Sequence, residues 1–151
     1  MPDEICITWL EFLRLVGKLA KKIPNKYWTW VLIGSNGFLV GAALYNKVSR
    51  DIIKKATPVF VQAKHYKGKI KEKIIILSPI LGKIKGPVLI VDDIVDSGET
   101  ALAVKKKLGK SNIDLAVIFK KHWSKVKPDY YVAKTDKWVV FPWEAGKLWN
   151  Y

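Results

Sequence analysis

The chain alternates between continuous apolar runs and segments whose apolar residues recur at helical spacing. The continuous runs cover residues 27–33, 57–64, 73–80, 86–93 and 112–120. Short apolar runs bounded by turn residues are typical of strands that are buried on both faces of a parallel sheet. The pattern therefore predicts a buried strand at each of these ranges.

The segments between these runs predict helices. An amphipathic stretch that ends near Lys22 begins with Thr8 three residues before Glu11, which is the spacing of a capping box. Residues 38–48 and 97–109 show apolar positions at helical spacing and predict two further helices.

Strands that alternate with helices predict an α/β fold with a mostly parallel central sheet flanked by helices. The lysine-rich residues 65–73 (HYKGKIKEK) have no apolar face and predict a loop or a hairpin tip. Residues 129–133 and 138–141 predict short extended segments. Because the chain has 151 residues and no linker or repeat, we expect a single domain over residues 1–151.

The composition is that of a packed globular protein, with 50% hydrophobic and 12% aromatic residues. No run approaches the roughly 20 apolar residues of a membrane span, and residues 1–12 do not resemble a secretory signal. We therefore expect a soluble, cytoplasmic protein with no membrane partner. Cys6 is the only cysteine, so it cannot form an intramolecular disulfide, and we expect it to be a buried small hydrophobe.

The charge balance is strongly basic, with 27 Lys and Arg against 13 Asp and Glu and a formal net charge of +14. Such a surface attracts anions, among them nucleic acid, acidic membranes and polyphosphate ligands. The lysines are spread along the chain rather than gathered in one block, so we expect most of them to form an ordinary solvated surface.

Residues 88–101 (VLIVDDIVDSGETA) gather four acids in this basic chain: Asp92, Asp93, Asp96 and Glu99. Ligands of open α/β sheets bind at the carboxyl ends of the strands, where Asp92 and Asp93 fall. The helix that follows offers unpaired backbone N–H groups to a phosphate, while carboxylates accept hydrogen bonds from sugar hydroxyls or hold Mg²⁺ through water. The pattern favours a sugar-phosphate site, although a helix capped by acids explains the same residues without a ligand.

The same stretch resembles the phosphoribosyl-diphosphate motif of type I phosphoribosyltransferases, in which an apolar strand, two acids and two apolar residues precede a loop rich in Asp, Thr, Ser and Gly. Residues 121–144 resemble the purine-binding end of the xanthine-guanine and hypoxanthine-guanine enzymes of this family. The resemblance covers about residues 27–144. It implies the type I fold, with a small purine-binding hood built from terminal segments.

The resemblance also implies roles at the sugar and its phosphates. Asp92 and Asp93 would contact the ribose hydroxyls and hold the cofactor Mg²⁺, with Asp93 nearer to the Mg²⁺–diphosphate assembly. Asp96 would lie near N7 of the base and accept its proton, which makes it the candidate catalytic residue. The 5′-phosphate would be wrapped by the loop residues Asp96, Ser97, Gly98, Glu99 and Thr100.

At the base, the resemblance assigns four positions. Lys121 would donate to the exocyclic oxygen of a 6-oxopurine, Trp138 would stack on the purine face, and the backbone at Val139 would read its edge. Glu144 matches an acidic position near the base and the metal. Without the resemblance, the residues alone favour a surface lysine at position 121 and a core tryptophan at position 138.

The match is imperfect at the predicted diphosphate site, which is the polar turn that contains Ser35, Asn36 and Gly37. Members of the family commonly have a basic residue followed by glycines in this turn. Here Ser35 stands in the place of the basic residue and Asn36 in the place of a glycine. The turn therefore lacks the expected charge.

The sequence favours a purine phosphoribosyltransferase of nucleotide salvage, with phosphoribosyl diphosphate and a purine base as substrates and a homodimer or larger homo-oligomer as its assembly. Lys121 favours an oxygen at C6 but leaves hypoxanthine, guanine and xanthine open. The alternative is a regulator that senses phosphoribosyl diphosphate and binds RNA or DNA, because some relatives have that role and a charge of +14 suits phosphate contacts.

Overall fold

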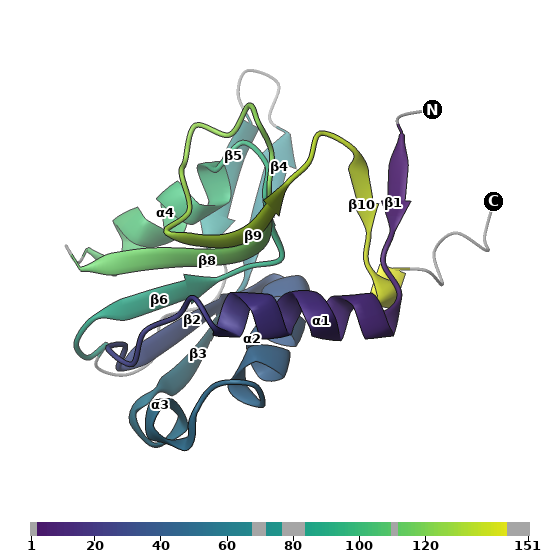
Figure 1. The fold of residues 1–151 in the computed structure, drawn as a ribbon. Helices are drawn as coiled ribbons and strands as arrows, with labels where there is room; N and C mark the ends of the chain where they lie inside the picture. Colours follow the sequence, from purple (N-terminus) through teal and green to yellow (C-terminus); the bar gives the residue numbers. More distant parts are fainter. Residues whose placement is uncertain (1–2, 68–71, 77–83, 110–111, 145–151) are drawn as a thin grey trace.

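A six-stranded sheet forms the centre of the molecule in the computed structural model, which describes residues 3–67, 72–76, 84–109 and 112–144 (Figure 1). The strands are β2 (Thr29–Ile33), β3 (Thr57–Val61), β6 (Val88–Val91), β7 (Ile94–Val95), β8 (Ile113–Lys120) and β9 (Tyr130–Lys134). Their order is β3-β2-β6-β8, with β7 following β6 along the same edge of β8 and β9 on the other edge. Every one of these pairings is parallel, as predicted.

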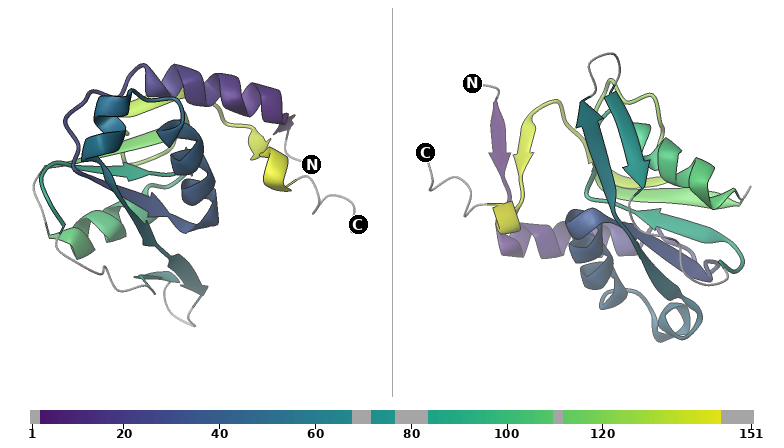
Figure 2. Two further views of the ribbon diagram at one scale, coloured as in Figure 1. Left: turned by 90° about the horizontal axis from the view of Figure 1, so that it is seen from below. Right: turned by 180° about the vertical axis from the view of Figure 1, so that it is seen from behind.

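Helices cover both faces of this sheet (Figures 1 and 2). On one face lie α1 (Trp9–Ala20) and α2 (Gly34–Tyr45), and on the other lies α4 (Glu99–Leu108); the short α3 (Arg50–Lys55) leads into β3. Strand β6 contributes side chains to the hydrophobic clusters on both faces of the sheet. Leu89 and Val91 pack into the core beneath α1 and α2, whereas Val88 and Ile90 pack beneath α4, so its continuous apolar run is buried on both sides.

The helix ends follow the local signals in the sequence. Thr8 caps α1, since its side chain accepts a hydrogen bond from the backbone N–H of Glu11 at 3.2 Å while Glu11 accepts one from the backbone N–H of Thr8 at 2.8 Å. Helix α4 ends at Gly109, which takes the left-handed φ of +60° that favours glycine. Throughout the described ranges, each helix is too short or too polar to cross a membrane.

The two ends of the described chain meet outside the central sheet, where β1 (Glu4–Cys6) pairs in parallel with β10 (Trp138–Val140) (Figure 1). We call β1, β10 and residues 141–144 the hood. Trp143 fixes the hood to the body because its ring stacks on Phe141 at 4.7 Å and meets the edge of Phe12 in α1 at 5.0 Å. A hood built from terminal segments is therefore confirmed.

Three expectations need correction. Residues 34–37 are not a turn but the first turn of α2, because Gly34 adopts φ +60° and lets the helix start directly after β2. The run 57–64 is divided between β3 and β4 (Ala63–Lys67), and β4 pairs in antiparallel fashion with β5 (Glu72–Ile76). Residues 68–71 of the lysine-rich stretch lie outside the described residues. Cys6 is exposed rather than buried, since its strand belongs to the two-stranded hood sheet. Residues 77–80 of the predicted strand 73–80 lie outside the described residues.

Candidate active site

The acidic pair Asp92 and Asp93 lies between β6 and β7, at the carboxyl end of the central sheet. Asp93 is only 7% exposed. Its Oδ1 accepts a hydrogen bond from the backbone N–H of Ile94 at 2.8 Å, and its Oδ2 accepts one from Asn36 Nδ2 at 2.9 Å. Asp92 Oδ1 accepts one from the backbone N–H of Asp93 at 2.9 Å. The strand end thus holds two neighbouring carboxylates in fixed orientations.

Both acids have pKa values above that of a free aspartate, and burial is the main cause. It raises the pKa of Asp92 well above its ordinary value, and the negative charge of Asp93 raises it further. Burial also raises the pKa of Asp93. Hydrogen bonds with Asp92, Asn36 and the backbone N–H of Ile94 lower this pKa but only partly offset the effect of burial. Two carboxylates that disfavour each other's charge attract a cation or hydrogen-bond donors such as sugar hydroxyls.

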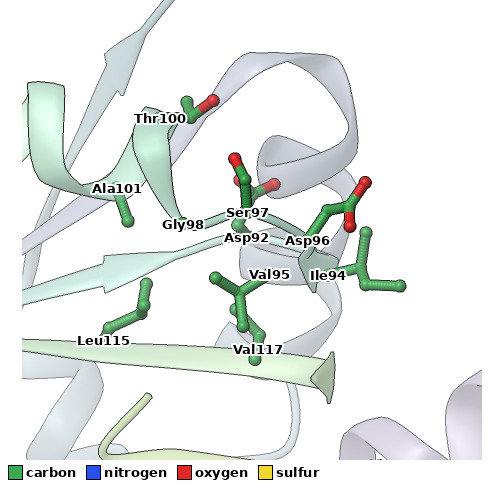
Figure 3. A pocket seen from close by; sticks show the side chains of 10 residues that line it. All are labelled: Asp92, Ile94, Val95, Asp96, Ser97, Gly98, Thr100, Ala101, Leu115 and Val117. Atoms are coloured by element: carbon green, nitrogen blue, oxygen red, sulfur yellow. The ribbon is translucent and has the colours of Figure 1, made fainter. Parts of the chain in front are cut away.

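The loop that follows opens a cavity of about 150 Å³ at the start of α4 (Figure 3). Figure 3 shows the polar side chains of Asp92, Asp96 and Ser97 on one side of this loop and the apolar Val95 and Val117 on the other. The residues that line the cavity are Asp92, Ile94, Val95, Asp96, Ser97, Gly98, Thr100, Ala101, Leu115 and Val117. Five of the predicted site residues therefore meet at one cavity, whereas Glu99 is exposed and is not among the residues that line it.

The loop needs glycine at position 98. Gly98 is the N-cap of α4 and has φ +90°, and a Cβ atom there would lie 2.5 Å from Cγ2 of Val126. Gly98 has no side chain that could cap α4, and Ser97 Oγ accepts a hydrogen bond from the backbone N–H of Glu99, the first residue of α4, at 3.3 Å. The backbone N–H groups of its first turn and the positive end of its dipole border the cavity, which suits an anion such as phosphate.

The predicted diphosphate residues lie at the start of α2, beside the acidic pair. Gly37 lets the helix approach β6, because a Cβ atom at this position would lie 2.6 Å from the carbonyl oxygen of Val91. Ser35 is exposed at the helix start. The side chain of Asn36 has two partners, since its Nδ2 donates to Asp93 and its Oδ1 accepts a hydrogen bond from Trp143 Nε1 at 3.1 Å. Asn36 therefore joins the hood to the acidic pair.

Lys121 is buried rather than a surface lysine, with 6% of its surface exposed. It follows β8, and its Nζ donates a hydrogen bond to the carbonyl oxygen of Lys137, directly before Trp138. Trp138 is 59% exposed, so its ring is open to a ligand rather than part of the core. Val139 is buried in the hood. Glu144 Oε2 accepts a hydrogen bond from the backbone N–H of Phe141 at 3.1 Å and so caps the turn after β10.

Sequence reasoning missed Trp123. Its Nε1 donates a hydrogen bond to Asp96 Oδ1 at 2.5 Å, and its ring lies 5.3 Å from Lys121 Nζ. One indole thus contacts both the predicted proton acceptor and the predicted oxygen-binding lysine. The polar stretch KHWSKVK has no apolar periodicity that would single out this tryptophan. Trp123 and Asp96 are also 27 residues apart along the chain, so the sequence does not reveal their contact.

A metal at this site would depend on Asp92 and Asp93. Within the described part of the chain, no group of three or more His, Cys, Asp or Glu residues gathers as a metal site. The mutual repulsion of the two carboxylates nevertheless fits a divalent cation that takes its remaining ligands from water or from a bound diphosphate.

Acids, a glycine loop and a helix N-terminus lie together at the carboxyl end of this α/β sheet. Proteins with this architecture bind a phosphorylated ligand there. The family model described as "Phosphoribosyl transferase domain" matches residues 8–148. The chain therefore belongs to the phosphoribosyl transferase domain family.

Named relatives agree with this membership. A xanthine-guanine phosphoribosyltransferase of Gluconobacter oxydans is 29% identical over 147 residues, which cover 94% of this chain and 85% of that protein. The crystal structure of a purine phosphoribosyltransferase from Pyrococcus horikoshii has a TM-score of 0.81 and 31% identity, with 94% of each chain covered. A xanthine-guanine-hypoxanthine phosphoribosyltransferase of Helicobacter pylori shares the fold, with a TM-score of 0.73, 23% identity and coverage of 98% and 99%.

Proposed function

We propose that this protein is a purine phosphoribosyltransferase, which joins a 6-oxopurine to phosphoribosyl diphosphate and releases a nucleoside 5′-monophosphate and diphosphate. The observation that carries the proposal is the cavity in which Asp92, Asp96 and the start of α4 meet. The relatives at 29% and 31% identity are both named as purine-type transferases. These names favour an enzyme over the nucleic-acid-binding regulator.

The cavity at the start of α4 would take the 5′-phosphate. The backbone from Ser97 to Thr100 would donate hydrogen bonds to it, and the dipole of α4 would stabilise its charge. Asp92 and Asp93 would accept hydrogen bonds from the ribose hydroxyls next to it. The diphosphate would lie at the start of α2, near Ser35, Asn36 and Gly37, beyond the acidic pair.

The base would lie between the loop and the hood. An ammonium group has three donors, and Lys121 uses one of them on the carbonyl oxygen of Lys137, so it retains donors for the oxygen at C6 of the purine. The exposed ring of Trp138 offers a stacking surface next to that carbonyl group. This arrangement favours hypoxanthine, guanine and xanthine over adenine, whose C6 carries an amino group.

Asp96 would move the proton. Its Oδ2 accepts the proton from N7 of the base, so that the N7–H bond breaks and its electron pair remains in the purine ring. N9 then forms a bond to C1′ of the ribose while the bond from C1′ to the diphosphate oxygen breaks, and the diphosphate leaves with that pair. The nearby carboxylates stabilise the positive charge that develops on the sugar.

Mg²⁺ is the cofactor in this proposal, and Asp92 and Asp93 would hold it. When bound, it neutralises the charge of the diphosphate as it leaves. Because the start of α2 has no basic side chain between Ile33 and Gly37, this neutralisation is essential. The homodimer and the cytoplasmic location stay predictions of the sequence.

A turnover assay tests the proposal. The purified protein is mixed with phosphoribosyl diphosphate, Mg²⁺ and hypoxanthine, guanine, xanthine or adenine in turn, and the nucleotide is measured by chromatography. We expect a nucleoside monophosphate from at least one 6-oxopurine and little or none from adenine. No product from any base, together with salt-sensitive binding to RNA or DNA, would contradict the proposal and favour the regulator.

A further inference from the structure

Trp123 makes an unusual contact for an indole that is more than half exposed. It lies three residues after the end of β8, and 56% of its surface is exposed. Its Nε1 nevertheless donates a hydrogen bond to Asp96 Oδ1 at 2.5 Å. Because an indole has a single N–H donor, this donor is fully committed to the carboxylate.

The same indole also faces the buried lysine of the site. Lys121 Nζ lies 5.3 Å from the centre of the Trp123 ring, within the range of a cation–π interaction. That ammonium group is held in turn by the carbonyl oxygen of Lys137. Trp123 therefore bridges a carboxylate on the phosphate loop and an ammonium group that belongs to the hood side of the site.

Stabilisation of the fold does not account well for these contacts. Trp123 is outside both described hydrophobic clusters, so its ring contributes little to the core. A hydrogen bond on an exposed side chain contributes little net free energy of folding because water competes for both partners. What the contact does is fix the position of one carboxylate oxygen.

We propose that Trp123 is the residue that positions Asp96 for proton transfer at the base site. The indole N–H holds Oδ1, so that Oδ2 is left free to accept the N7 proton of the purine. The ring at the same time forms the wall between Asp96 and Lys121, and so fixes the spacing between the groups that would recognise N7 and the oxygen at C6. This inference rests on the proposed function.

The substitution Trp123→Phe tests the role of the N–H donor, because it keeps an aromatic ring and removes the donor. We expect kcat to fall about tenfold, since a misplaced catalytic group lowers the rate steeply, while KM for phosphoribosyl diphosphate stays unchanged. Trp28→Phe is the matched control. Trp28 is 45% exposed and its ring lies 5.1 Å from Lys55 Nζ, but it is remote from the acidic loop, so its replacement should leave kcat unchanged.

A double-mutant cycle separates positioning from a structural effect. In an Asp96→Asn background, Trp123→Phe should change kcat by less than about twofold, because the group that it positions is already disabled. An equal loss in both backgrounds would overturn the inference. So would an unchanged kcat for Trp123→Phe in an enzyme that is otherwise active.

A spectroscopic measurement keeps this test distinct from that of the proposed function. The Nε1–H proton resonance of Trp123 is identified by its loss in Trp123→Phe, and we expect it to shift when Asp96 is replaced by Asn. A wild-type protein without turnover would contradict the proposed function alone. The Nε1–H resonance of Trp123 would still show whether Trp123 donates a hydrogen bond to Asp96. A resonance that stays in place in Asp96→Asn would overturn the positioning role of Trp123.

Discussion

The side-chain amide of Asn36 donates a 2.9 Å hydrogen bond to Oδ2 of the buried Asp93. Its carbonyl oxygen accepts a hydrogen bond from Trp143 in the hood at 3.1 Å. The family resemblance predicts a diphosphate contact at position 36, in place of a family glycine. In the structure the amide connects the acidic pair to the hood, so that the two halves of the site are held in one arrangement, and the diphosphate contact stays a prediction.

Asn36→Ala should destabilise the protein and weaken its use of phosphoribosyl diphosphate. The substitution leaves Asp93 Oδ2 and Trp143 Nε1 without these partners, which should lower the free energy of unfolding by about 1 to 3 kcal/mol. Chemical denaturation measures this loss, and steady-state kinetics should show a higher KM for phosphoribosyl diphosphate.

Asn46→Ala is the matched control for this substitution. Asn46 lies at the other end of α2, where its exposed side chain donates to the carbonyl oxygen of Ala42 at 2.9 Å. Its replacement should change the free energy of unfolding by less than about 0.5 kcal/mol. Equal stability changes for the two variants would show that Asn36 does not connect the hood to the acidic pair.

Asp96→Asn should lower kcat by at least about tenfold, because a positioned general base contributes about 10² to 10⁴ to the rate. The amide keeps the shape of the side chain and accepts a hydrogen bond, but it does not take up the N7 proton. Asp51→Asn, an exposed acid in the first turn of α3, serves as the control. An unchanged kcat for Asp96→Asn would remove Asp96 as the proton acceptor.

Lys121→Met should raise KM for the 6-oxopurine by about 10- to 100-fold, which corresponds to the loss of a hydrogen bond from a charged group. KM for phosphoribosyl diphosphate should stay the same, because Lys121 lies on the hood side of the site. Lys120→Met is the control, since Lys120 is the adjacent lysine at the end of β8 and is only partly buried. A rise in both KM values would point to a general disturbance rather than to base recognition.

At the other end of β8, Asp114 forms an ion pair with Lys26 Nζ at 2.8 Å and accepts a hydrogen bond from the Tyr27 hydroxyl. A substitution there should change the stability of the protein and leave its activity unchanged. Burial alone would raise the pKa of Asp114, but the hydrogen bonds from Lys26 and Tyr27 outweigh it and lower the pKa. A carboxyl group whose folded-state pKa is lowered contributes stability above its unfolded-state pKa. It loses that stability as the pH falls through the folded-state pKa.

Asp114→Asn should therefore lower the free energy of unfolding at pH 7 by about 1 to 2 kcal/mol, and its difference from wild type should shrink as the pH falls below the ordinary pKa of an aspartate, about 3.9. Turnover at pH 7 should be unchanged, because Asp114 is not among the residues that line the cavity and its side chain contacts Tyr27 on the opposite face of the sheet from Leu115. Asp136→Asn removes an exposed pair with His122, and because water screens that pair, it should change the free energy of unfolding less than Asp114→Asn does. A pH-independent loss at Asp114 would contradict the role of its charge.

Local sequence patterns correctly predict the structural features that are determined by residues adjacent in the chain. The capping box of Thr8 and Glu11, the apolar strand before Asp92 and the glycine end of α4 each follow from a few consecutive side chains. The phosphate loop is visible in the sequence for the same reason, since its acids, hydroxyls and Gly98 are adjacent in the chain.

Features that depend on distant residues escape such patterns. The polar residues 34–37 predict a turn, but the missing Cβ of Gly37 lets a helix start there and pack against the carbonyl group of Val91 in another strand. The contact of Trp123 with Asp96 and the burial of Lys121 depend on how β8 lies beside β7. No local pattern marks such contacts, so only the structure revealed them.

The most direct test of the account is a crystal structure of the protein with inosine 5′-monophosphate. We expect the 5′-phosphate within hydrogen-bond distance of the backbone N–H groups of residues 97–100. The base should lie on the ring of Trp138, with its C6 oxygen near Lys121 Nζ and its N7 near Asp96. A nucleotide bound elsewhere, for example with its phosphate on the lysine-rich outer surface and the cavity at α4 empty, would contradict the account.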